Sequence, residues 1–230
     1  MQLRNGQEFK GIELGYFDDR TNTFDWVQNN NRSAVQSRAG DFPAMAMATN
    51  QDGLMVLIYQ TTASKLQYNK WEKFVAFAEH KDFPNIEARH KDRDLPMEQF
   101  SEIYTRFCKS LIGVGASGGQ DAPSGMETEF VALNNPYIDD LSDGFAVQVL
   151  YRGAARTDAQ VEVFERATDG TVGITYVRTD DQGHVIIPVK PDHTYLLDAV
   201  VLREPDDTIA NDRGVVWETL WASLTFSVPK

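Results

Sequence analysis

Apolar and polar residues alternate with a period of two along most of the chain after Met126. This alternation places successive side chains on opposite faces of a strand, and it is typical of antiparallel sheets with one buried face. The stretches are short, and Gly, Asp and Pro turns separate them over about 105 residues, the size of an immunoglobulin-like β-sandwich. The apolar positions are Phe145, Val147, Val149 and Tyr151; Val161 and Val163; Val185, Ile187 and Val189; Tyr195, Leu197, Ala199 and Val201; and Leu220, Ala222, Leu224, Phe226 and Val228.

The first 60 residues also have a β-rich pattern. Its clearest feature is a run of apolar residues at 54–60, which follows the turn pair Asp52-Gly53 and has the length of a buried strand. We therefore expect a β-rich N-terminal domain, and the whole chain to be mainly β.

A different period, typical of helices, follows the predicted strand at 54–60. Ser64 and Gln67 have the spacing of a capping box, which predicts that a helix starts at Ser64. A second helix is predicted to start at Leu95-Pro96 and to run to about residue 113. The apolar positions with helical spacing are Trp71, Phe74, Val75 and Ala78 in the first helix, and Phe100, Ile103, Tyr104, Phe107, Cys108 and Leu111 in the second.

A run rich in glycine and polar residues gives the best domain boundary. Residues 117–125 have the composition of a linker. The sequence therefore predicts an N-terminal β-rich domain at 1–116, with a two-helix insertion at about 64–113, and a C-terminal sandwich at 126–230.

The negative charge is concentrated in the second half. The net charge of −12 divides into −2 for residues 1–123, which carry 14 basic and 16 acidic groups, and −10 for residues 124–230, which carry 8 and 18. A phosphate backbone would be repelled by the second half, so we expect no nucleic-acid partner. Such acidity more often gives a well-solvated surface than a cation site. No apolar run reaches the roughly 20 residues of a membrane-spanning helix, so we expect none.

No pattern in the sequence predicts a catalytic centre. There is no Gly-x-Ser-x-Gly motif, and the single cysteine, Cys108, lies on an apolar stripe, where a thiol usually acts as a small hydrophobic residue. The glycine-rich run at 113–119 follows a predicted helix, whereas a phosphate-binding loop precedes one. These observations favour a non-enzymatic protein.

Four residues between the two predicted helices are the candidate metal ligands. His80, Asp82, His90 and Asp92 fall in one irregular, charged stretch, and they could converge on a divalent cation. The alternative is that this stretch is a solvated loop.

Two tryptophans are predicted on the outward face of the last strand. If Leu220, Ala222 and Leu224 face the core, then Trp217 and Trp221 point to the opposite face. Indole rings are rarely left in water, so they would form a ligand or partner patch, or they would pack against the first domain. We favour the packing interpretation.

Several segments resemble one bacterial family in the same order. They are WETLWASLTFSVP at 217–229, YTRFCKSLIGVG at 104–115, and TDDQGHVIIP at 179–188 followed by YLLDA at 195–199. They resemble the exported family of unknown function DUF4198, also described as NikM-like after a component of nickel and cobalt uptake systems. The resemblance covers the chain from about Leu54 to its end.

The resemblance implies an exported, periplasmic protein with two immunoglobulin-like β-sandwich domains, the first with a helical insertion. It further implies a role in nickel or cobalt handling beside a metal-uptake membrane complex. Members usually have a His-x-Phe-Trp segment after their signal, and this chain has neither. A metal site that used that histidine would be absent here. Either the chain begins one strand late, which we favour, or this member never bound metal at that position.

The resemblance and the sequence patterns support two functions from different classes. The first is a non-enzymatic periplasmic binding or accessory protein, with nickel or cobalt as its ligand. The second is a structural or protein-interaction module of the cell envelope that docks through Trp217 and Trp221. A hydrolase built on a sandwich is a third and weaker hypothesis.

Overall fold

A large open sheet forms the body of the molecule. A computed structural model describes residues 1–49 and 51–230, and within them nine strands form this sheet in the order β12-β11-β14-β15-β7-β5-β3-β4, with β6 also paired to β7. The strands are β3 (Thr21–Gln28), β4 (Asn31–Ala34), β5 (Gly53–Thr61), β6 (Ser64–Tyr68), β7 (Phe100–Val114), β11 (Gln160–Arg166), β12 (Val172–Arg178), β14 (Thr194–Arg203) and β15 (Trp217–Ser227).

A smaller sheet packs against one face of the large sheet. It contains β8 (Thr128–Ala132), β9 (Phe145–Tyr151), β10 (Ala154–Ala155) and β13 (His184–Ile187), with β9 paired to the other three. The apolar core between the sheets includes Phe107 and Leu111 of β7, Phe145 of β9 and Leu224 of β15. We call the face of the large sheet toward this core the inner face and the opposite one the outer face.

The large sheet joins the two halves of the sequence. Strand β7 pairs in parallel with β15 from Glu102 opposite Trp217 to Ser110 opposite Thr225. Residues 117–125 contain no helix or strand and lead from β7 to β8. Their backbone is tied to the sheet, because Gly118 O accepts a hydrogen bond of 2.7 Å from Leu54 N. The predicted linker thus separates stretches of sequence that share one sheet.

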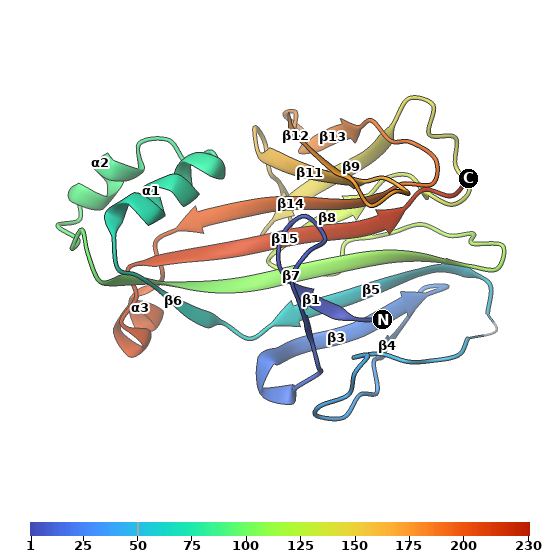
Figure 1. Cartoon of the computed structure of the whole chain (residues 1–230), viewed down its shortest axis with the longest axis horizontal. Coiled ribbons are helices and arrows are strands. Elements are labelled where there is room, and N and C mark those ends of the chain that lie inside the picture. Colours follow the sequence, from blue (N-terminus) through green and yellow to red (C-terminus); the bar gives the residue numbers. More distant parts are fainter. Residues whose placement is uncertain (50) are drawn as a thin grey trace.

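Two groups of elements cover parts of the outer face. Helices α1 (Trp71–His80) and α2 (Ile86–Lys91) lie at one end, and the hairpin of β1 (Leu3–Asn5) and β2 (Ile12–Leu14) crosses β7 and β15 nearer the middle (Figure 1). A short helix, α3 (Asp207–Arg213), leads into β15, and the Asp206 side chain caps it by accepting a hydrogen bond from Ile209 N. A 3-10 turn at Asp18–Arg20 leads into β3.

The period-two pattern after Met126 is confirmed as sheet, and the chain is mainly β. The structure also has elements that the pattern did not predict, namely β8, β12 and α3. No helix among residues 1–49 and 51–230 has the length and apolar character needed to cross a membrane.

The helix predicted at about 95–113 is wrong, because this segment is β7. Apolar side chains occupy both faces of β7 near its start: Ile103 faces inward, whereas Phe100 faces outward under the helices. A strand that is buried on both faces has no clean alternation, and its apolar positions can imitate helical spacing.

The helix predicted to start at Ser64 is also misplaced. Residues 64–68 form β6, and the helix begins at Trp71 with Lys70 at its N-cap. Ser64 and Gln67 have capping-box spacing without forming a cap, since β6 pairs with β7 from Ser64 to Tyr68. The apolar stripe from Trp71 to Ala78 is confirmed as helical. The two-helix insertion therefore consists of two short helices between β6 and β7.

Candidate functional site

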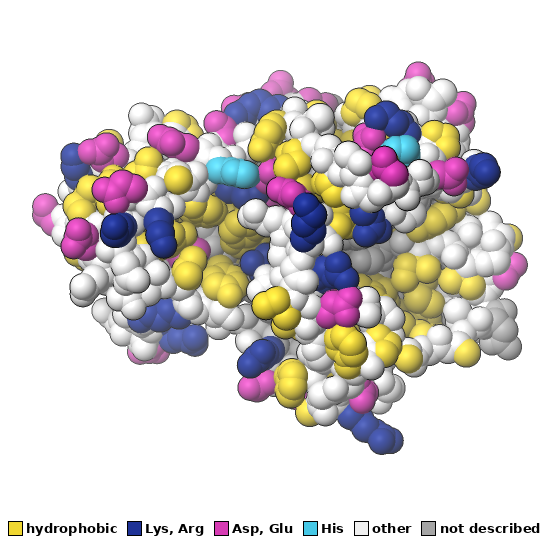
Figure 2. All heavy atoms as spheres, in the orientation of Figure 1, with side chains coloured by type: hydrophobic (Ala, Val, Ile, Leu, Met, Phe, Trp, Pro, Cys, Tyr) yellow, Lys and Arg dark blue, Asp and Glu magenta, His cyan; other side chains and the backbone are white. Residues whose placement is uncertain are grey.

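A groove runs between the N-terminal hairpin and the outer face of the large sheet. It consists of a cavity of about 780 Å³ and an adjoining one of about 320 Å³. The two are continuous, because both are lined by Arg4 and Asn5 of the hairpin and by Arg106, Cys108 and Ser223 of the sheet. Figure 2 shows this side of the molecule hollowed beside the hairpin. We call the two cavities together the hairpin groove.

Strands β15, β7 and β5 supply the floor of the groove in layers set by their register. Trp221 lies opposite Arg106, Ser223 opposite Cys108, and Thr225 opposite Ser110. On the other side of β7, Tyr59 lies opposite Cys108 and Leu57 opposite Ser110. Since outward side chains recur every second residue, successive layers are roughly 7 Å apart. The floor therefore carries a cation at Arg106 and hydroxyl groups in the next two layers, with Leu57 beside Ser110 in the last.

The hairpin forms the roof of the groove and bonds mainly to itself. Arg4 donates to Phe9 O at 2.7 Å, and its Nη2 lies 2.5 Å from Glu13 Oε1. The base of the hairpin is held by the backbone bond from Tyr16 N to Asp41 O. Among the described residues we find no hydrogen bond from residues 2–14 to a strand of the large sheet. The tip contacts the sheet through Arg166, whose guanidinium lies 4.5 Å from the Phe9 ring centre.

The larger cavity is lined by basic residues and, within the described part of the chain, by no acidic residue. The basic side chains are Arg4, Lys10, Arg20 and Arg106. Lys109 also borders the cavity, but its ammonium group points to the inner face, where it pairs with Asp121 and Glu129. Arg4 is paired with Glu13. Lys10 Nζ lies 3.7 Å from Glu8 Oε2. Among the described residues, Arg20 and Arg106 have no ion pair, and they leave a positive lining in a protein whose net charge is −12.

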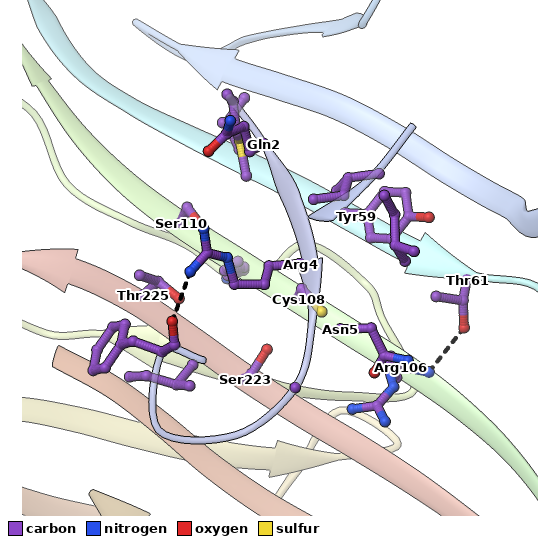
Figure 3. Close-up of a pocket in the computed structure, with 18 of the residues that line it drawn as sticks. Gln2, Arg4, Asn5, Tyr59, Thr61, Arg106, Cys108, Ser110, Ser223 and Thr225 are labelled. Carbon is purple, nitrogen blue, oxygen red and sulfur yellow. Dashed lines mark hydrogen bonds between the residues drawn. The ribbon is translucent and has the colours of Figure 1, made fainter. Parts of the chain in front are cut away.

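Arg106 is the most distinctive cation of the groove. Its guanidinium lies 5.3 Å from the Trp221 ring centre and 5.5 Å from that of Tyr104. Its backbone N–H donates to Thr61 Oγ1 (Figure 3). In the part of the chain that the structure describes, the guanidinium has no hydrogen bond and no ion pair. It therefore offers free donors at the junction of the two cavities.

The smaller cavity ends at a compact ionic cluster. Lys81 Nζ lies 2.5 Å from both Glu162 Oε2 and Asp198 Oδ2, and His80 Nε2 lies 2.9 Å from Glu162 Oε1. Burial raises the pKa of Asp198, and although burial alone would lower the pKa of Lys81, the carboxylates beside it raise it. The cluster ties the end of α1 to β11 and β14, and Lys81 also lies 5.1 Å from the Trp221 ring centre.

The nucleophiles of the groove have no catalytic base beside them. Burial raises the pKa of the Cys108 thiol, so little of it is thiolate at neutral pH. Ser110, Ser223 and Thr225 line the groove, but among the described residues no histidine lines either cavity. Asp198, the single carboxylate among the described residues that line the smaller cavity, is paired with Lys81. This geometry suits binding and does not supply the nucleophile–base pair of a hydrolase.

The four predicted metal ligands lie in separate environments. His80 contacts Glu162, and Asp82 is paired with Arg178. Asp92 is exposed at the end of α2. Among residues 1–49 and 51–230, no three His, Cys, Asp or Glu side chains come together in a way that could hold a metal ion.

His90 is fully buried and both of its ring nitrogens are engaged. Nδ1 accepts a hydrogen bond of 3.0 Å from Trp217 Nε1, so Nε2 carries the proton and donates to Pro96 O at 3.0 Å. Burial lowers the pKa of His90, which keeps the ring neutral. No lone pair on the ring is left for a metal.

The two predicted patch tryptophans have different surroundings. Trp217 is fully buried and stacks with Phe74 of α1 at a ring distance of 5.9 Å. Trp221 is half-buried, stacks with Phe77 at 5.7 Å and lines the smaller cavity. Both point to the outer face, as the alternation of β15 predicts.

Sequence reasoning missed the hairpin groove itself. Arg106, Cys108 and Ser110 were assigned to a helix, whereas as alternate residues of β7 they share one face. Their alternation was not a clear signal, because the polar residues Thr105 and Lys109 lie next to them in the chain, on the other face. No local signal connects this run to the hairpin, which lies about 100 residues earlier in the chain.

One comparison with known proteins gave a match. The family model described as "Domain of unknown function (DUF4198)" matches residues 1–203. No curated protein and no solved structure matches this chain.

Proposed function

This chain belongs to the DUF4198 family, and we propose that it is a non-enzymatic binding protein that holds an anionic ligand in the hairpin groove. The observation that carries the proposal is the lining of the larger cavity, where basic side chains meet no acidic residue among those described. Ligand sites are concave, largely preformed and furnished with a few convergent polar groups, and the groove has all three features.

The charge of the lining opposes the charge of the protein as a whole. A chain of net charge −12 repels anions at long range, so the positive charge of Arg20 and Arg106 in the groove lining is a local exception. Charge complementarity of this kind selects the sign of the ligand and speeds its capture. A free divalent cation would meet like charge there.

A non-enzymatic role is supported by the chemistry of the groove. Its thiol has a raised pKa, and its hydroxyl groups have no histidine beside them in the described chain. The arrangement can hold a ligand by its charge, but it offers no group to activate water or to accept a proton from a nucleophile.

The nickel or cobalt role that the family resemblance suggests takes a particular form in this proposal. Since the groove is cationic, the metal would arrive as an anionic complex, such as a carboxylate chelate, and not as the free ion. Delivery to a metal-uptake membrane complex in the periplasm is part of the same proposal.

The division into two immunoglobulin-like domains also stays a prediction, and proteolysis at residues 117–125 would test it.

The alternative function, an envelope module that docks through Trp217 and Trp221, has less support. Trp217 is fully buried under α1 and α2, so a partner could reach it only if the helices moved away. Trp221 is also half-covered, by Phe77.

Calorimetric titration of the full chain would test the proposal. The titrants are citrate, nickel citrate, cobalt citrate, and the chlorides of both metals. We expect heat from at least one citrate form, at least tenfold weaker binding in the double variant Arg20→Gln/Arg106→Gln, and unchanged binding in the control Arg38→Gln, whose arginine is exposed outside the groove. Binding of the free metals alone, or equal binding by all variants, would contradict the proposal.

A further inference from the structure

The hairpin groove changes in character along its length. At the layer of Trp221 and Arg106 its floor carries a cation, and two layers further Leu57 lies beside Ser110. The two layers are separated by roughly 13 Å, because side chains on one face recur every second residue. A ligand that spans them would meet different chemistry at its two ends.

The charged end has room for one anionic group. Arg106 is half-buried, is held between two aromatic rings, and lines both cavities. Its free N–H groups form a planar fork that matches a carboxylate in two parallel hydrogen bonds. Asn5 and Ser223 line both cavities as well and are suitable hydrogen-bonding partners for the same group (Figure 3).

The larger cavity also has an apolar part to its lining. Leu3, Leu14 and Phe17 contribute to it from the N-terminal segment, and Leu57 and Tyr59 contribute from β5. Leu3 and Leu57 are buried in one cluster, whereas Phe17 is 40% exposed. Removal of apolar surface from water is favourable, so a ligand with an apolar body would bind more tightly by covering these side chains. A small, fully polar anion would leave this part of the groove unused.

From the free guanidinium of Arg106 and the apolar lining of the same cavity, and resting on the anion-binding function above, we propose that the ligand is an organic acid with a carboxylate head and an apolar body. Arg106 binds the head, and the body lies in the larger cavity between the hairpin and β5. The hydroxyl groups of Ser110, Ser223 and Thr225 border the body on its other side.

Three probes separate the contributions of head and body. Decanoate has both, 1-decanol has the body with an uncharged head, and acetate has the head alone. In titrations of the full chain, decanoate should bind more tightly than either of the others. Arg106→Gln should weaken decanoate about ten- to hundredfold and leave 1-decanol unchanged, since it removes a charge-assisted pair of hydrogen bonds.

A variant in the apolar part of the lining gives the opposite pattern. Phe17→Ser, at a partly exposed position, should weaken decanoate and 1-decanol by the same factor, up to about tenfold, and leave acetate unchanged. Arg38→Gln is the matched control for loss of one positive charge, and thermal melts of all variants would verify that they are folded.

The outcomes distinguish this inference from the function on which it rests. Equal binding of decanoate and 1-decanol, or full decanoate affinity in a folded Arg106→Gln protein, would overturn the assignment of the head group. If citrate binds and decanoate does not, the amphipathic ligand is wrong and the anion-binding function stands. If no anion binds, both fail.

Discussion

The two faces of the large sheet are formed by the same strands, but one is packed in the core and the other borders a groove. On β7, Phe107, Lys109 and Leu111 face the core, whereas Arg106 and Cys108 face the groove. The inner face is closed by the smaller sheet and tightly packed. The outer face is bridged by the N-terminal hairpin and remains hollow.

The contrast is sharpest for the two cations on β7, Lys109 and Arg106. The side chain of Lys109 is fully buried, and its Nζ lies 3.2 Å from Asp121 Oδ1 and 2.8 Å from Glu129 Oε2. Arg106, half-buried, has no such partner among the described residues. A buried charge must be paired to be tolerated, so the pairing of Lys109 stabilises the fold. Under the proposed function, an anionic ligand would be the partner of Arg106.

The largest expected effect comes from breaking the ion cluster of the inner face. Lys109→Met leaves Asp121 and Glu129 buried without their cation, and we expect it to lower the free energy of unfolding by about 3–5 kcal/mol. Chemical denaturation would measure the loss. Arg106→Met, on the same strand, should cost at most about 1 kcal/mol, the value of an exposed cation–π contact.

Neutralising the whole cluster is the control for this prediction. The triple variant Lys109→Met/Asp121→Asn/Glu129→Gln has no unpaired charge, so it should recover part of the stability that Lys109→Met loses. Recovery would be incomplete, because Glu129 also accepts hydrogen bonds from Ser124 N and Gly125 N. If the triple variant is as unstable as Lys109→Met, packing and not charge explains the loss.

Much of the fold follows from local patterns in the sequence, and the exceptions share a cause. Strands β9, β14 and the second part of β15 alternate cleanly, because one face packs in the core between the two sheets and the other is more exposed. Strand β7 does not, since part of its outer face is buried under α1 and α2. Burial on both faces removes the signal that distinguishes a strand from a helix.

The hairpin groove was less accessible to sequence reasoning than the strands. Its roof comes from residues 1–17, and its floor comes from β5, β7 and β15, which meet only through long-range pairing. The net charge of each half also gave no sign of the groove, because all its arginines lie in residues 1–123, where acidic residues outnumber the basic ones and the net charge is −2. The outward direction of Trp221 was predictable from β15 alone, whereas its place beside Arg106 depends on the parallel pairing of β7.

The next prediction concerns Glu102, at the helix-covered end of the outer face. Its carboxyl is buried, its Oε2 has no hydrogen-bond partner among the described residues, and burial raises its pKa to about 7. The folded state therefore binds this proton more tightly than the unfolded chain, whose ordinary value is 4.5. The contribution of this protonation to the free energy of unfolding is fully present below pH 4.5, and it is lost as the pH rises through about 7.

Glu102→Gln removes this titration while keeping the shape of the side chain. Relative to the natural protein, the variant should be more stable by on the order of 3 kcal/mol above pH 8, and nearly equal to it at pH 4. Denaturation curves at both pH values would measure the difference. A constant difference across the range would show that Glu102 does not titrate in the folded protein.

The smallest effect on stability should come from the tip of the hairpin, which forms the roof of the groove. Arg166→Gln removes the cation over the Phe9 ring, a contact worth about 0.5–1 kcal/mol at an exposed site. Because the hairpin bonds to itself and to residues 38–45, global stability should change by no more than this amount, while amide exchange in residues 5–12 should become faster. Phe9→Leu, which keeps an apolar side chain but removes the ring, should give the same acceleration. Unchanged exchange in both variants would mean that the tip is held by other contacts, and that the roof is as fixed as the inner face.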